Sequence, residues 1–104
     1  MNEENKTITM VEGEFGVSLP ITIVGAEMTD EDNLLFTIKN ADNEEIINKQ
    51  FTNIIDNTID FVLTKLESDK LKKGYYFYSI DWFRNDEFMA NIINGEIFHV
   101  EGKI

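Results

Sequence analysis

Few side chains in this sequence of 104 residues have the chemistry of a nucleophile or a general base. It contains one histidine, His99, no cysteine, and three serines, Ser18, Ser68 and Ser79. A catalytic triad is recognised by the geometry of a nucleophile, a base and an orienting acid, yet neither Ser68 nor His99 lies in a nucleophile-elbow motif. We therefore predict a non-catalytic protein, and we expect His99 to be an outward-facing residue of the last strand.

Carboxylates are abundant, but they are grouped where solvated turns are expected. They cluster at residues 27–32, 42–45 and 86–87, whereas a glycosidase needs two carboxyl groups that flank one substrate bond. Asp60 and Asp81 instead interrupt strand patterns, where an outward charge commonly blocks edge pairing. The carboxylates therefore predict solvated faces rather than a hydrolase site.

A cation site is the remaining use of one acidic loop. Asp30, Glu31 and Asp32 supply the hard oxygen ligands that calcium prefers, although the spaced D-x-D-x-D-G pattern of a helix-loop-helix calcium site is missing. One histidine without cysteine gives zinc too few ligands. We predict that the domain needs no cofactor, and we keep these three residues as the candidate metal ligands.

The densest run of large side chains is the stretch 71–84, which holds all three tyrosines and the single tryptophan. Side chains of a strand alternate between its two faces. One face is expected to build the core: Tyr76, Tyr78, Ile80 and Trp82. The opposite face carries the other aromatic residues: Tyr75, Phe77 and Phe83. An exposed aromatic patch marks a contact site, so this second face is the candidate contact surface, together with Met89.

Charge excludes several classes of partner. The formal net charge is −11, from 20 acidic and 9 basic residues. Binding to a nucleic-acid backbone rests on a basic footprint, so no nucleic-acid partner is predicted, and an anionic membrane surface is disfavoured for the same reason. Residues 1–4 show neither a basic nor an apolar region, so no signal peptide is predicted, and no apolar run is long enough to span a bilayer.

The pattern of apolar residues predicts one all-β domain over residues 1–104. Alternation and β-branched residues indicate seven strands, at residues 6–11, 17–23, 34–38, 45–51, 58–63, 75–84 and 87–100. Pro20 removes a ladder donor, so its strand is expected at an edge or with a bulge. Asn85-Asp86 is expected to form a hairpin turn. Asn94-Gly95 fits either a further hairpin turn or a bulge within one long last strand, and we favour the bulge.

A single short helix is predicted before the aromatic strand. Thr64 and Glu67 have the spacing of a capping box, and Gly74 is expected to end the segment. Leu71-x-x-Gly74-x-Tyr76 then resembles the corner at which strand F of an immunoglobulin-type domain begins, where the tyrosine hydroxyl bonds to backbone upstream. The predicted fold is therefore an immunoglobulin-like β-sandwich of about seven antiparallel strands, with one short helix before the Leu71–Gly74 corner.

A family resemblance extends over nearly the whole chain. It rests on four spaced patterns: Glu12-Gly13-Glu14 followed by Leu19-x-Ile21; Leu34-x-Phe36-x-Ile38; Leu71-x-x-Gly74-x-Tyr76-x-Tyr78-x-Ile80; and Ile92-Ile93-x-Gly95-x-Ile97-Phe98-x-Val100. Together these patterns resemble the N-terminal immunoglobulin-like domain of the baseplate upper protein of phages that infect Gram-positive bacteria.

The resemblance implies a structural component of a phage or prophage virion, assembled in the cytoplasm of the host bacterium. It implies an adaptor that acts through protein–protein contact, either with other tail and baseplate proteins or with itself, and it brings no catalytic residue. The alternative hypothesis is an immunoglobulin-like module that binds a small ligand or a glycan, assisted by calcium at Asp30, Glu31 and Asp32.

Overall fold

The computed structural model describes residues 6–103. These residues form seven strands and one short helix. In chain order they are β1 (Ile8–Val11), β2 (Leu19–Thr22), β3 (Asp32–Lys39), β4 (Glu45–Phe51), β5 (Thr58–Phe61), α1 (Lys65–Ser68), β6 (Gly74–Arg84) and β7 (Glu87–Glu101).

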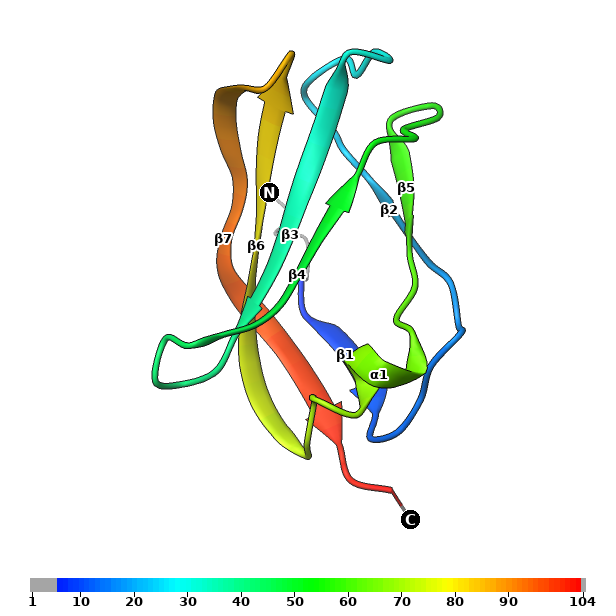
Figure 1. Cartoon of the computed structure of the whole chain (residues 1–104), viewed down its shortest axis with the longest axis vertical. Helices are drawn as coiled ribbons and strands as arrows, with labels where there is room; N and C mark the ends of the chain where they lie inside the picture. Colours follow the sequence, from blue (N-terminus) through cyan, green and yellow to red (C-terminus); the bar gives the residue numbers. More distant parts are fainter. Residues whose placement is uncertain (1–5, 104) are drawn as a thin grey trace, which may run out of the picture.

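The strands form two sheets that face each other (Figure 1). Sheet A has five strands in the order β1-β7-β6-β3-β4, and it lies on the left of the view; sheet B is the pair β2-β5 on the right. The first strand, β1, lies beside the last strand, β7, and runs in the same direction. The expectation of uniformly antiparallel strands is therefore wrong at this pair, which is parallel, with Ile8 opposite Phe98.

The core lies between the two sheets. Phe36 is at its centre, stacked on Phe61 from sheet B at 4.4 Å and on Tyr78 from β6 at 5.1 Å between ring centroids. The buried apolar side chains come from both sheets and from the connections between them: Met10, Ile23, Leu34, Phe36, Ile38, Ile47, Ile59, Phe61, Leu63, Leu71, Tyr78, Ile80, Phe98 and Val100. The predicted core residues Tyr76 and Trp82 pack against this cluster as half-buried side chains.

The predicted strands match the observed ones closely. Pro20 lies in a strand that is an edge of sheet B, as expected. The turn between β6 and β7 places Asn85 and Asp86 at positive φ, 51° and 66°, as a tight hairpin turn requires. β7 continues through Gly95, which has a φ of 72° beside a shift in register. One long last strand with an irregularity is thus confirmed over a separate hairpin arm.

The segment before β6 contains the predicted cap. The Thr64 hydroxyl accepts from the Glu67 N–H, and the Glu67 carboxylate accepts from the Thr64 N–H. Leu71 is buried, and the Lys72 N–H donates to the Tyr76 hydroxyl at 2.8 Å. This hydrogen bond ties the start of β6 to the turn before it. Leu66 on α1 is 78% exposed.

Candidate functional site

The outer face of sheet A carries the aromatic residues that were left over from the core. Register across β6 and β7 pairs Tyr75 with His99 and Phe77 with Ile97. The Tyr75 and His99 rings are stacked, with centroids 4.3 Å apart and planes within 6°. We call this set, Tyr75, Phe77, Ile97 and His99, the aromatic end of sheet A.

Exposure makes the aromatic end available for contact. Tyr75 is 63% exposed, Phe77 40% and Ile97 38%. Burying apolar surface stabilises a complex by about 25 cal/mol per Å² removed from water. Three adjacent large side chains on one rigid sheet therefore have the chemistry of a protein contact surface.

The other two predicted contact residues lie elsewhere. Phe83 is half-buried near the far end of β6, where it packs edge-on against Phe88 with centroids 5.7 Å apart. Met89 is exposed on β7 beside this pair. Phe83 lies six residue steps along the strand from Phe77, about 20 Å at about 3.3 Å per residue.

Polar side chains occupy the part of the outer face between its two apolar ends. The Asn91 amide donates to the Asp81 carboxylate at 2.7 Å, and the Gly95 N–H donates to the Ser79 hydroxyl at 3.2 Å. The face is thus divided, and the four predicted contact residues form two groups rather than one patch.

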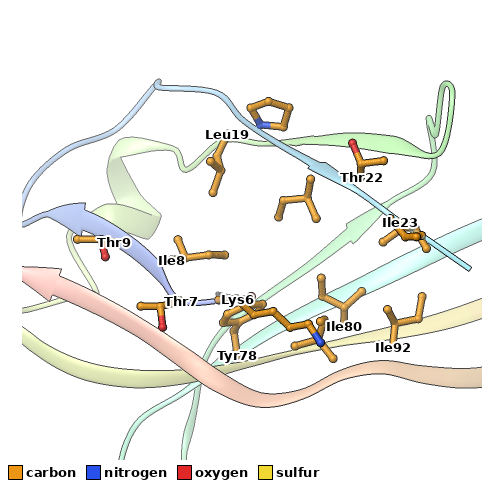
Figure 2. A pocket seen from close by; sticks show the side chains of 14 residues that line it. Lys6, Thr7, Ile8, Thr9, Leu19, Thr22, Ile23, Tyr78, Ile80 and Ile92 are labelled. Carbon is orange, nitrogen blue, oxygen red and sulfur yellow. Dashed lines mark hydrogen bonds between the residues drawn. The ribbon is translucent and has the colours of Figure 1, made fainter. Parts of the chain in front are cut away.

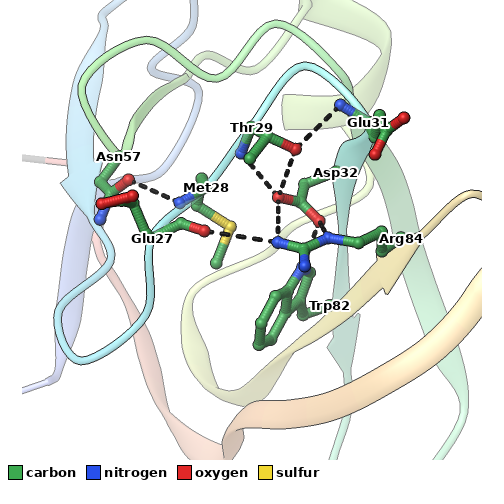
Figure 3. Close-up of polar contacts among 8 residues, drawn as sticks. All are labelled: Glu27, Met28, Thr29, Glu31, Asp32, Asn57, Trp82 and Arg84. Carbon is green, nitrogen blue, oxygen red and sulfur yellow. Dashed lines mark hydrogen bonds and ion pairs between the residues drawn. The ribbon is translucent and has the colours of Figure 1, made fainter.

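Asp32 is buried at the start of β3 and is held by three residues (Figure 3). One carboxylate oxygen, Oδ1, accepts from Trp82 Nε1 and Arg84 Nε, each at 2.8 Å; Oδ2 accepts from Arg84 Nη2 at 3.0 Å and from the Thr29 N–H at 2.6 Å. The Arg84 hydrogen bonds hold the pKa of Asp32 well below its ordinary value, against the opposing effect of burial. Its carboxylate therefore closes a structural network.

The three predicted metal ligands lie in different surroundings. Asp30 and Glu31 are exposed on the loop, whereas both oxygens of Asp32 are occupied by protein donors. Within residues 6–103 there is no group of three acidic or histidine side chains placed to hold a metal ion. The three neighbours in sequence do not converge in space.

Lys49 closes one side of the molecule, where β4 of sheet A meets sheet B. It is opposite Phe36 in the register of β3 and β4 and therefore points inward. Its amino group donates to the Val62 carbonyl at 2.6 Å and to the Glu67 carboxylate at 2.8 Å. Burial raises the pKa of Glu67, but the hydrogen bonds from Lys49 and Thr64 outweigh it, so that pKa lies below its ordinary value.

The opposite side carries a pocket, and Figure 2 shows the side chains that line it. A groove of about 440 Å³ runs between β2 and the edge of sheet A formed by β1 and β7. Its wall is mainly aliphatic: Ile8, Leu19, Ile21, Ile80, Ile92 and Ile93. A second hollow of about 230 Å³ shares Ile8, Thr9 and Leu19 with it and continues toward Phe15 and Val17. We call the two together the open groove.

Comparison with known proteins gave no match: no family model, no curated protein and no solved structure is significantly similar to this chain. Within the described residues, no helix has the length and apolarity to cross a membrane.

Several residues of these surfaces were not singled out in the sequence. Phe88 has a usable signal, because a two-residue turn at Asn85-Asp86 pairs Phe83 with Phe88 across the hairpin. Ile97 lies beyond the irregular part of β7, so counting from the turn does not find its partner. The open groove has no local signal at all, since its walls come from strands far apart in the chain.

Proposed function

We propose that this chain is a non-catalytic adaptor domain of a phage or prophage tail baseplate that binds protein through the aromatic end of sheet A. The observation that carries the proposal is the exposed group Tyr75, Phe77 and Ile97 on a rigid sheet. Support for the baseplate context is the sequence resemblance alone. Its location would be the virion, after assembly in the host cytoplasm.

The immunoglobulin-like fold belongs to the same proposal. It is supported by the order of the strands, by two facing sheets and by the Lys72–Tyr76 hydrogen bond at the start of β6. A tyrosine that bonds to backbone at this corner is a hallmark of immunoglobulin-type sandwiches. In such a domain, β3, β6 and β7 would present one face to a neighbour.

A binding assay with proteins encoded beside this chain tests the adaptor role. The double variant Tyr75→Ser/Phe77→Ser is expected to weaken capture of a neighbouring tail protein by at least about tenfold, as loss of a hot spot does. Leu66→Ser on α1 is the matched control, because Leu66 is equally apolar and more exposed. Equal effects of both variants would contradict the proposed surface.

Self-association is distinguished by sedimentation velocity of the chain alone. If a second copy covers the aromatic end, the molecular mass doubles at high concentration and returns to the monomer value in the double variant. A monomer at all concentrations assigns the surface to a different protein. Flanking genes for tail components support the baseplate context, and their absence argues against it.

The alternative is an immunoglobulin-like module that binds a glycan through the stacked Tyr75 and His99 rings. The Tyr75 ring is 63% exposed and stacks on the half-buried His99 ring, and a flat ring of this kind can cover the face of a sugar. A glycan array with and without calcium separates the two functions. Calcium-dependent binding to a defined glycan would overturn the adaptor proposal.

A further inference from the structure

We infer that the open groove is an acceptor site for one extended strand of a partner protein, with apolar side chains at alternate positions, an acidic residue near Lys6 and a basic residue near Glu14. The site is distinct from the aromatic end of sheet A, so the inference stands whether or not that surface binds protein.

The first observation is an unpaired strand edge on each side of the groove. Strand β1 pairs with β7 only over Phe98–Glu101, although β7 begins at Glu87. In the part of the chain that the structure describes, no strand pairs with the same edge of β7 before residue 98. β2 likewise pairs on one side only, with β5. Backbone edges of this kind add a further strand through main-chain hydrogen bonds.

The hydrogen bonds of β2 show which of its groups are available. The Ile23 N–H donates to the Asn57 carbonyl at 2.7 Å. Successive residues of a strand direct these groups to opposite edges, so the N–H and C=O of Thr22 point away from β5, toward the groove. Pro20 has the same orientation but no N–H, so it offers only an acceptor. The edge of β2 is thus partly protected against chance pairing but still able to bind a strand.

The lining specifies what the accepted strand must carry. The groove floor is aliphatic between the two edges, and its lining includes Ile92 and Ile93 from β7 and Ile21 from β2. A strand that enters this space directs every second side chain into it. Alternating branched apolar residues fill such a wall, whereas a helix would present residues at intervals of three and four.

Charge complementarity sets the ends of the accepted strand. Lys6 is the single charged residue of the larger hollow, and Figure 2 shows its side chain along the wall with Ile80 and Ile92. No carboxylate of residues 6–103 forms an ion pair with its amino group. Glu14 is the single charged residue of the smaller hollow. A partner strand with an acidic residue at the Lys6 end and a basic residue at the Glu14 end would complement these two charges.

The length of the groove suits one strand. Residues 17–24 line its two hollows on the side of sheet B, and an extended stretch of that size spans about 26 Å at about 3.3 Å per residue. A strand of ordinary length, about six residues, fits within it. The net charge of −11 disfavours a second copy of this chain as the donor.

Selection from a random peptide library displayed on phage tests the inference. Against the full chain, we expect enrichment of sequences with apolar residues at every second position, bracketed by one acid and one base. Against Lys6→Glu/Glu14→Lys, the order of the two charges should reverse. No enrichment, apolar residues at intervals of three and four, or identical sequences on both targets would overturn the inference.

Two measurements on the best peptide make the test independent of the charge variant. Val24, 82% exposed in the groove lining, should tolerate Val24→Asp without unfolding, and this change is expected to weaken binding at least about tenfold. Leu66→Asp, outside the groove, should leave the dissociation constant within about twofold. Amide exchange at Thr22 should slow on binding; unchanged exchange at Thr22 would contradict strand addition.

Discussion

The two sides on which sheet A meets sheet B are built from different chemistry. On the β4 side, the inward-pointing amino group of Lys49 bonds to Val62 and Glu67, so a charged side chain links β4 to the segment that follows β5. On the β2 side, no hydrogen bond joins β2 to β7 within residues 6–103, and aliphatic walls face each other across an open groove. One side is closed by polar contacts, and the other is left open.

The loop between β2 and β3 closes the end of the molecule in the same polar manner. The Asn57 side chain donates to the Ala26 carbonyl at 2.6 Å and accepts from the Met28 N–H at 2.9 Å. Asp32 then ties this loop to β6 through Arg84 and Trp82 (Figure 3). This small domain thus closes two of its sides with a few partly buried polar residues, and the side without them is where a further element can be added.

Among the variants considered, Asp32→Asn is expected to lower the free energy of unfolding the most. It removes the charge that Arg84 neutralises and leaves a buried amide among donors, which costs about 3 kcal/mol for a broken buried pair. Chemical denaturation followed by Trp82 fluorescence measures this loss. A change below about 1 kcal/mol would show that the network contributes little to stability.

Asp32 should also make the free energy of unfolding depend on pH in the acid range. The pKa of Asp32 is lowered in the folded state, so its contribution to the free energy of unfolding is complete above the unfolded pKa of about 3.9. That contribution is lost as the pH falls from there through the lowered folded pKa. Unfolding free energies of the wild type and Asp32→Asn should therefore converge below about pH 4. Parallel curves down to the acid transition would contradict this assignment.

Lys49→Met is expected to come next, with a loss of about 2 kcal/mol. The methionine keeps most of the apolar stem but removes a charge-assisted hydrogen bond to Val62 and the pairing with Glu67. Lys65→Met is the matched control, because the Lys65–Asp69 pair is exposed and such pairs contribute about 0.5 kcal/mol or less. Thermal unfolding of both variants compares the stability that the half-buried Lys49 contacts contribute with the stability that the exposed Lys65–Asp69 pair contributes.

Tyr78→Phe tests the edge of the open groove and should cost about 1 kcal/mol, the usual net value of one hydrogen bond. The Tyr78 hydroxyl donates to the Lys6 carbonyl and so holds the chain that enters β1. Burial, with the charge of Glu96, raises the pKa of Tyr78 to about 12. Because the folded pKa is the higher one, this contribution is present below about pH 10 and is lost as the pH rises through the folded value. The phenylalanine variant should lack this alkaline loss.

Pro20→Thr is expected to change stability least, by about 0.5 kcal/mol or less. Its main effect is expected at the unpaired edge of β2. It restores an N–H that points to the open groove, so the free edge of β2 gains the donor that proline withholds. We expect concentration-dependent self-association, measured by light scattering. Association of the variant no stronger than that of the wild type would argue that the missing donor at Pro20 does not protect this edge.

Much of the fold could be predicted because it depends on neighbours in sequence. Alternation located the strands, and turn residues such as Asn85-Asp86 located the hairpin. The cap at Thr64 and Glu67 is equally local, since both partners lie within one turn of chain. The direction of β1 relative to β7 was predicted wrongly, because the pairing joins residues about ninety positions apart and nothing near Ile8 records it.

The candidate sites likewise contain features that depend on sequence neighbours and features that depend on residues remote in the chain. Alternation along β6 was enough to place Tyr75 and Phe77 opposite the core, since period two is a property of the strand itself. Only the packing of distant strands decided that Asp32 meets Arg84 and that an open groove separates β2 from β7. Those contacts join residues that are remote in the chain, and a linear pattern carries no information about which remote edges will face each other.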